Sequence, residues 1–246
     1  MDENNLKKIL VKDIYDYLVS NESLDIKYEY VTLVPERRSI KMRARNNPWS
    51  ITRDEFIFIN KYIKSHGLKN AYEICTGFGI SSLSIGLGIK SNKGKLGTID
   101  AYIEEHYQND KAYAGDIRPV YNNVGFNSVS QLINLFLLED TIFPKIGISP
   151  EDVGKHVETI FKDDQLDFVF IDGLHIEKQA IKDFNAVLPF LNKERYAIFF
   201  HDGMLRIKNL AEIVKNELPD CNIYNNMNNI GNNFWMSLAT NISNEL

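Results

Sequence analysis

Residues 73–81 read Glu-Ile-Cys-Thr-Gly-Phe-Gly-Ile-Ser, and this stretch decides the fold. A short apolar run at 71–75 leads into the glycines, and an apolar segment follows them to about residue 89. The pattern predicts a strand, a tight loop and a helix, because Gly77 and Gly79 let the backbone turn sharply and approach a ligand. The free N–H groups at the start of such a helix favour a polar or anionic group.

An acid closes the next predicted strand. The apolar run at 96–99 ends at Asp100. A carboxylate at this place can accept hydrogen bonds from both hydroxyls of a ribose. A glycine loop alone is also typical of an ordinary strand-to-helix turn, but the loop and Asp100 together favour a nucleoside-binding site.

The rest of the chain alternates predicted strands and helices. Strands are expected at 141–148, 168–171, 196–200 and 234–239, and helices at 52–66, 127–138, 176–191 and 206–218. Ser149 and Pro150 are expected to begin a further helix, as its N-cap and first residue, and the Asn-rich stretch 225–233 to form a turn between the last two strands. The alternation predicts an α/β fold, a doubly wound and mainly parallel sheet with helices on both faces.

Two further predicted strands each end in an aspartate, Asp172 and Asp202. The carboxyl ends of parallel strands meet at one edge of a sheet, so we expect these side chains to lie close together. Two such carboxylates need a proton, a cation or water between them, and Mg²⁺ prefers oxygen ligands of this kind. The structural alternative is that each aspartate caps the helix that follows it.

Histidines accompany both aspartates. His175 follows Asp172 by three residues at the predicted start of a helix, and a neutral imidazole there can take a proton from a hydroxyl. Alternatively, His175 is simply a solvent-facing histidine at the start of a helix. His201, directly before Asp202, is the rival base.

Composition limits the classes of function. The chain has 246 residues, of which 44% are hydrophobic and 25% charged, proportions typical of a globular protein. The net charge of −5 and the lack of a basic run argue against nucleic acid as a partner. No stretch is apolar enough to span a bilayer, so we expect no membrane association and a cytoplasmic location. Cys75 and Cys221 are expected to be reduced thiols.

The residues at 73–81 resemble the first motif of class I S-adenosylmethionine-dependent methyltransferases. In the matching form of this motif, an acid and an apolar residue precede Gly-Thr-Gly-x-Gly-x-Ser, where x is any residue. Cys75 departs from the motif, because it stands where the first glycine is expected. Phe-Ile-Asp-Gly-Leu-His at 170–175, then Asp183, then His201-Asp202, resemble a narrower group: metal-dependent O-methyltransferases similar to the macrocin O-methyltransferase and cephalosporin hydroxylase-like family.

This resemblance implies a seven-stranded, Rossmann-like methyltransferase fold and assigns roles to particular residues. The base would be His175, and the Mg²⁺ ligands would be Asp172 and Asp202. The residues implied to bind S-adenosylmethionine are Glu73, Cys75, Gly77, Gly79, Ser81, Asp100 and Asp172. Relatives of the catechol type carry Asn where this chain has Gly203, so a third metal ligand would come from elsewhere, with Glu104, Glu105 or His106 as candidates.

The pattern of predicted elements along the chain also suggests the domain organisation. Residues 51–246 would form the methyltransferase domain, with an insertion at about 102–123 whose tyrosines line an acceptor pocket or form the packing face of a cap. Residues 1–50, with a helix at 5–19 and an extended segment at 27–34, would serve as a cap or as a contact in a homo-oligomer.

The implied activity is Mg²⁺-assisted methyl transfer to a hydroxyl of a sugar or another small molecule, including a phenol-like one. One alternative is a nicotinamide-dependent oxidoreductase. It is disfavoured because Ser82 stands where the nicotinamide motif has its third glycine and because no Tyr-x-x-x-Lys pair is evident. The other alternative is a non-catalytic nucleoside-binding protein on the same fold.

Overall fold

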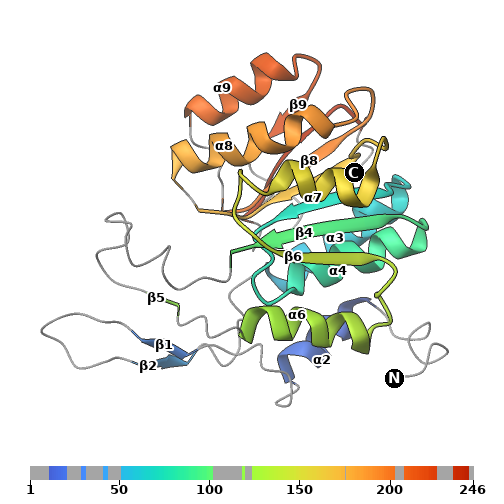
Figure 1. Ribbon diagram of the computed structural model, residues 1–246, viewed down its shortest axis with the longest axis vertical. Helices are drawn as coiled ribbons and strands as arrows, with labels where there is room; N and C mark the ends of the chain where they lie inside the picture. The colour runs from blue at the N-terminus through green and yellow to red at the C-terminus, as the bar shows by residue number, and fades with distance from the viewer. Residues whose placement is uncertain are drawn as a thin grey trace, which may run out of the picture.

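The computed structural model describes residues 11–20, 29–31, 41–43, 51–101, 118–119, 124–174, 176–202, 208–225 and 235–243. A seven-stranded sheet runs through the centre of the molecule in the order β6-β4-β3-β7-β8-β10-β9 (Figure 1). The strands are β3 (Asn70–Ile74), β4 (Lys95–Asp100), β6 (Ile142–Ile146), β7 (Phe168–Ile171), β8 (Ala197–Phe200), β9 (Asn222–Tyr224) and β10 (Ser237–Thr240). All neighbouring pairs from β6 to β8 are parallel, and β10 is antiparallel to both of its neighbours. The predicted fold class is confirmed.

Helices cover both faces of this sheet, as Figure 1 shows. One face is covered by α3 (Arg53–Ser65), α4 (Ile80–Ser91) and α6 (Val124–Leu135), with α2 (Val11–Ser20) packed on α3. The other face is covered by α7 (Val153–Phe161), α8 (Glu177–Val187) and α9 (Lys208–Glu217), and a 3-10 turn, η2 (Leu188–Phe190), follows α8.

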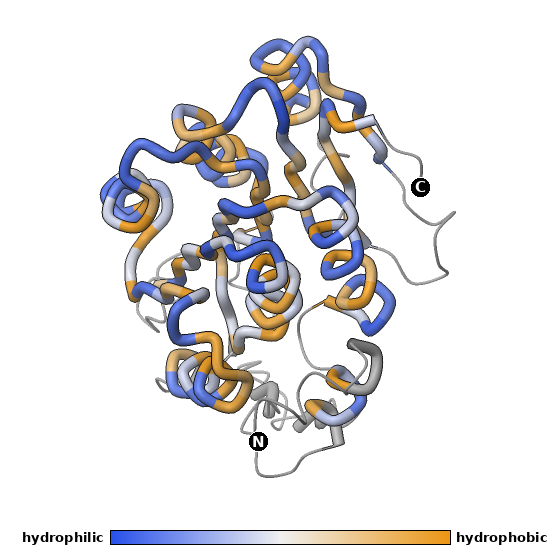
Figure 2. The backbone as a smooth tube through the Cα atoms, turned by 90° about the vertical axis from the view of Figure 1, so that its right-hand side faces the viewer, coloured by the Kyte–Doolittle hydropathy of each residue, from blue (hydrophilic) through white to orange (hydrophobic). Residues whose placement is uncertain are grey.

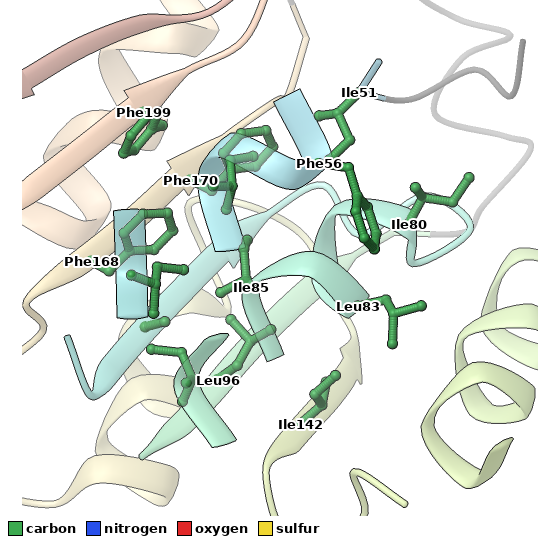
Figure 3. Close-up of a cluster of buried hydrophobic side chains, with 14 of the residues drawn as sticks. Ile51, Phe56, Ile80, Leu83, Ile85, Leu96, Ile142, Phe168, Phe170 and Phe199 are labelled. Carbon is green, nitrogen blue, oxygen red and sulfur yellow. The ribbon is translucent and has the colours of Figure 1, made fainter. Parts of the chain in front are cut away.

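The central strands are apolar on both faces, as expected for parallel strands covered by helices. Phe168, Phe170 and Phe199 point toward α3 and α4, into the cluster drawn in Figure 3. Their neighbours Val169 and Ile171 pack against the helices of the other face. Hydrophobic and hydrophilic residues alternate along the outer helices (Figure 2), as expected for helices with one apolar side. The helix α4 differs, because most of its residues are buried.

The start of α7 differs from the prediction. The helix begins at Val153, so the prediction that Ser149 and Pro150 begin it is wrong. The Ser149 hydroxyl instead donates a hydrogen bond to Oδ1 of Asp183 at 2.6 Å. Oδ2 of Asp152 accepts one from the backbone N–H of Ile148 at 2.9 Å. The side chains of Ser149 and Asp152 therefore make hydrogen bonds across the turn, and Ser149 does not cap an earlier helix start.

A second, small sheet joins the N-terminal segment to the predicted insertion of the main domain. β1 (Glu29–Val31) pairs antiparallel with both β2 (Lys41–Arg43) and β5 (Arg118–Pro119). The extended N-terminal segment therefore meets a strand from the predicted insertion. Whether residues 1–50 act as a cap or as a contact between copies of the chain stays a prediction. Among the helices that the structure describes, none has the length and apolar character needed to cross a bilayer.

Candidate functional site

The carboxyl ends of four parallel strands meet at one edge of the main sheet. The register pairs Ile74 of β3 with Ile99 of β4 and with Ile171 of β7, and Ile171 in turn with Phe200 of β8. The residues that directly follow these four are therefore neighbours along the edge: Cys75, Asp100, Asp172 and His201. Predicted site residues from distant parts of the sequence are thus brought together.

The glycine loop leaves β3 and turns directly into α4. Gly77 has φ +53° and Gly79 has φ +85°, a left-handed backbone that favours glycine. A Cβ on Gly79 would lie 2.9 Å from Cγ2 of Val129 in α6, whereas a Cβ on Gly77 would meet nothing within 4 Å. Gly79 is therefore required by both backbone and packing, while the space above Gly77 is open.

Asp100 is bound to this loop. The backbone N–H of Gly77 donates to Oδ2 of Asp100 at 2.9 Å. The Asp100 residue is 8% exposed. The contact fixes a carboxylate of β4 against the loop that follows β3, the arrangement expected of a nucleoside site.

Glu73 lies beneath the loop and is fully buried. Its Oε2 accepts hydrogen bonds from the hydroxyls of Ser82 and Thr98, the latter at 2.6 Å. Burial raises the pKa of Glu73 to about 7, although the Ser81, Ser82 and Thr98 hydroxyls favour its charged form. The side chain ties β3 to β4 and α4, and Ser81 is buried beside it. A direct contact of Glu73 or Ser81 with a cofactor stays a prediction.

Cys75 occupies a backbone position suited to glycine. Its φ is +75°, in the region that side chains with a Cβ rarely adopt. This gives a physical reason for the glycine expected there by resemblance. Burial and the carboxylates of Asp100 and Asp172 raise the pKa of the Cys75 thiol well above its usual value, so the thiol stays protonated.

The acids of β7 and β8 meet around His201. Nδ1 of His201 lies 3.0 Å from Oδ1 of Asp172 and 3.5 Å from Oδ1 of Asp202. One potential ligand atom from each of these three residues lies within 4.8 Å of the others. The expected proximity of the two aspartates is therefore found, with His201 between them.

Glu55, at the start of α3, belongs to the same cluster and was missed by the sequence analysis. Its Oε2 lies 3.3 Å from Nε2 of His201. Burial disfavours a charged imidazole, but the carboxylates of Asp172 and Glu55 outweigh it and raise the pKa of His201 well above its usual value. The available signal was the capping box formed by Thr52 and Glu55, which predicts a helix start and no contact with a residue 146 positions away.

Asp183, the acid on the helix after β7, has a supporting position. It is buried, and its Oδ1 accepts hydrogen bonds from Ser149 and from Gln179, the latter at 2.8 Å. A Cβ on Gly173 would lie 2.6 Å from its Oδ2. Asp183 therefore packs under the segment that follows Asp172.

Several predicted site residues lie outside the described residues. The expected base, His175, is one of them, and so is Gly203, which stands where catechol-type relatives carry Asn. The others are the candidate third metal ligands Glu104, Glu105 and His106, and the tyrosines of the insertion, Tyr102, Tyr107, Tyr113 and Tyr121.

Solved structures share this fold. An O-methyltransferase from Bacillus cereus in complex with S-adenosylhomocysteine is 16% identical, with a TM-score of 0.54 over 78% of this chain and 82% of that chain. The O-methyltransferase TomG from Streptomyces achromogenes, involved in tomaymycin synthesis and in complex with S-adenosylmethionine, is 12% identical, with a TM-score of 0.55 over the same shares. At these identities the likeness establishes the fold. No curated protein sequence in the comparison matches the chain.

The sequence of residues 72–203 matches a family described as a methyltransferase domain. The matched region makes up more than half of the chain and contains the glycine loop, Asp100, Asp172 and His201. The match confirms the predicted enzyme class, a methyltransferase. The chain therefore belongs to this family of methyltransferase domains.

Proposed function

We propose that the chain is an O-methyltransferase that binds S-adenosylmethionine over the loop at Gly77–Gly79. The observation that carries the proposal is the hydrogen bond from the Gly77 N–H to Oδ2 of Asp100, because it places a carboxylate beside the glycine loop at the carboxyl edge of the sheet. A ribose there can donate its hydroxyls to Asp100. The nucleoside then lies against the N-terminus of α4.

Other residues of the motif complete this side of the site. Gly77 leaves room for the close approach of a ligand, since nothing lies within 4 Å of where its Cβ would stand. Cys75 and Asp172 line the adjoining strand ends, and Glu73 with Ser81 supports the loop from below. In this proposal the contacts of these residues with the cofactor follow the family resemblance.

The strand-end cluster fits a hard divalent ion such as Mg²⁺. Asp172 and Asp202 offer carboxylate oxygens, and their side chains are 17% and 39% exposed, so an ion can reach them from solvent. Bound there, Mg²⁺ would supply positive charge that lowers the pKa of an acceptor hydroxyl. We propose Asp172 and Asp202 as its ligands.

The protein's own contribution is alignment and proton removal, because the methyl group of a sulfonium is already activated for an in-line displacement. The sheet edge holds the acceptor oxygen between the cofactor side at Asp100 and the acids at Asp172 and Asp202. His175, three residues after Asp172, is proposed to take the hydroxyl proton. The acceptor is proposed to be a small molecule with a hydroxyl on a sugar or phenol-like ring, and the O-methyltransferases that share the fold support this class.

Calorimetry tests the cofactor first. The chain should bind S-adenosylhomocysteine and S-adenosylmethionine and should not bind NAD. Binding of NAD alone would favour the oxidoreductase, and binding without transfer to any hydroxyl acceptor would favour the non-catalytic protein. Methyl transfer that requires Mg²⁺ and is abolished by Asp172→Ala and by His175→Ala would support the assigned roles.

A further inference from the structure

Glu55 joins three segments that are distant in the sequence. Its Oε2 accepts a hydrogen bond from the backbone N–H of Thr52 at 2.7 Å and lies 3.3 Å from Nε2 of His201. Its Oε1 accepts one from the backbone N–H of Trp235 at 2.6 Å. The residue is 0% exposed. A carboxylate buried this completely is costly unless its hydrogen bonds are made, so these contacts define its place.

Capping the helix does not account for these contacts. The capping box needs only the exchange between Thr52 and Glu55 at the start of α3. The contacts with Trp235 and His201 lie beyond it, and both partners stand at the same end of the sheet. Ser237, two residues after Trp235, pairs with Phe200, which directly precedes His201.

The imidazole of His201 is held on both sides. Nε2 faces Glu55, and Nδ1 faces Oδ1 of Asp172 at 3.0 Å. A ring with both nitrogens engaged cannot turn without losing a hydrogen bond, and its orientation in turn fixes the Asp172 oxygen that it contacts.

We propose that Glu55 is a positioning residue of the acceptor side of the site. It orients His201, and through it the carboxylate of Asp172, and it also anchors the backbone of Trp235, whose side chain is 59% exposed at the same edge. This inference rests on the proposed function. The hydrogen bonds of Glu55 go to Thr52, His201 and Trp235 and not to the loop at Gly77–Gly79, so its effect should fall mainly on one half of the site.

The test compares Glu55→Gln with Asp54→Asn. Both variants remove one negative charge from the first turn of α3, but Asp54 is exposed whereas Glu55 is buried. Glutamine keeps the size of the side chain and replaces one acceptor oxygen with a donor. Three N–H groups face the two oxygens of Glu55, so at least one loses its acceptor. The readouts are the ring ¹⁵N signals of His201, assigned with His201→Asn, together with affinities for Mg²⁺ and S-adenosylhomocysteine.

Glu55→Gln should displace the His201 ring signals and weaken Mg²⁺ binding by about tenfold, the scale of a lost contact behind a metal ligand. Its affinity for S-adenosylhomocysteine should fall by much less than its affinity for Mg²⁺, because Asp172 borders the cofactor side while Asp100 and the glycine loop keep their hydrogen bond. Asp54→Asn should leave all three readouts unchanged. Unmoved His201 signals in Glu55→Gln, or equal losses of Mg²⁺ and nucleoside binding, would overturn the inference.

The proposed function itself would be contradicted by a wild-type protein that binds neither ligand. If wild-type protein binds neither Mg²⁺ nor S-adenosylhomocysteine, the His201 ring signals alone decide whether Glu55 positions the ring. If Glu55→Gln does not fold, Glu55→Asp replaces it, because it keeps the charge and shortens the side chain by one methylene. The same displacement of the His201 signals is expected from that variant, and its absence contradicts the inference.

Discussion

The two halves of the strand-end site are built in different ways. The half proposed to bind the cofactor is built on residues 73–81 and Asp100, and its hydrogen bonds join one strand, the loop after it and the next strand. Asp172 borders both halves. The acceptor half consists of Glu55, Asp172, His201 and Asp202, which come from α3, β7 and β8. The cofactor half is nearly contiguous in the chain, whereas tertiary packing assembles the acceptor half.

This difference predicts largely separate effects for substitutions at Asp100 or in the glycine loop and for substitutions at Glu55 or Asp202, with Asp172 shared by the two halves. Hydrogen bonds within the cofactor half do not pass through His201, and those of Glu55 do not reach the glycine loop. Substitutions in separate contact networks usually have additive effects.

The largest expected effect is on nucleoside binding. Asp100→Ala removes the carboxylate proposed to hold the ribose and the acceptor of the Gly77 N–H. We expect a loss of about 3 kcal/mol in binding of S-adenosylhomocysteine, more than about a hundredfold in affinity. Calorimetry measures it. Asp202→Ala, in the acceptor half, should leave this affinity unchanged, and an equal loss in both variants would break the comparison.

The next effect is on stability and depends on pH. The pKa of Glu73 rises from 4.5 to about 7 in the folded protein, so between these values the folded state holds a proton that the unfolded state releases. The stability tied to this proton is complete below pH 4.5 and is lost as pH rises through 7. Glu73→Gln needs no proton. The difference between its free energy of unfolding and that of wild type should therefore shift in favour of the variant by about 2 to 3 kcal/mol between pH 5 and pH 8.

Urea unfolding at several pH values measures this difference. The exposed Glu139→Gln is the control and should show a difference from wild type that does not change with pH. A flat difference for Glu73→Gln would mean that the buried carboxyl is not held in its protonated form.

A smaller effect distinguishes the two glycines of the loop. Gly79→Ala combines a left-handed φ with a close contact to Val129 and should lower the free energy of unfolding by about 2 kcal/mol. Gly77→Ala meets only the backbone cost, about 1 kcal/mol, because no atom lies near its Cβ. Chemical denaturation measures both. Equal losses would show that packing against α6 contributes nothing.

The smallest effect is expected at Cys75. Cys75→Gly relieves a left-handed φ of +75° and should raise the free energy of unfolding by up to about 1 kcal/mol. Cys75→Ser keeps the Cβ and should not show this gain. If the serine variant became more stable, or the glycine variant did not, the left-handed backbone of Cys75 would not be the source of the lost stability.

The sequence predicted the fold and the position of Asp100 beside the glycine loop because both depend on local patterns. Apolar runs separated by turn residues located β3, β4, β7 and β8, and the sheet rule then placed Asp100, Asp172 and Asp202 at one edge. The start of α7 was wrong because Ser149 bonds to Asp183 across the turn, a contact with no signature in the sequence around residue 149.

Glu55 shows the limit of the same reasoning. Its spacing from Thr52 is a local pattern that predicts a helix cap. Its contact with His201 depends on how α3 packs on the sheet, which no spacing encodes. The contacts of the His201 ring with two carboxylates were likewise not predicted, and its role as a rival base stays a prediction.

The most direct test of the central claim is a crystal structure grown with S-adenosylhomocysteine. The nucleoside is expected to cross the backbone at Gly77–Gly79, with both ribose hydroxyls within hydrogen-bonding distance of Asp100. A fully occupied nucleoside bound elsewhere on the protein, or its absence at saturating concentration with the loop as described, would contradict the account.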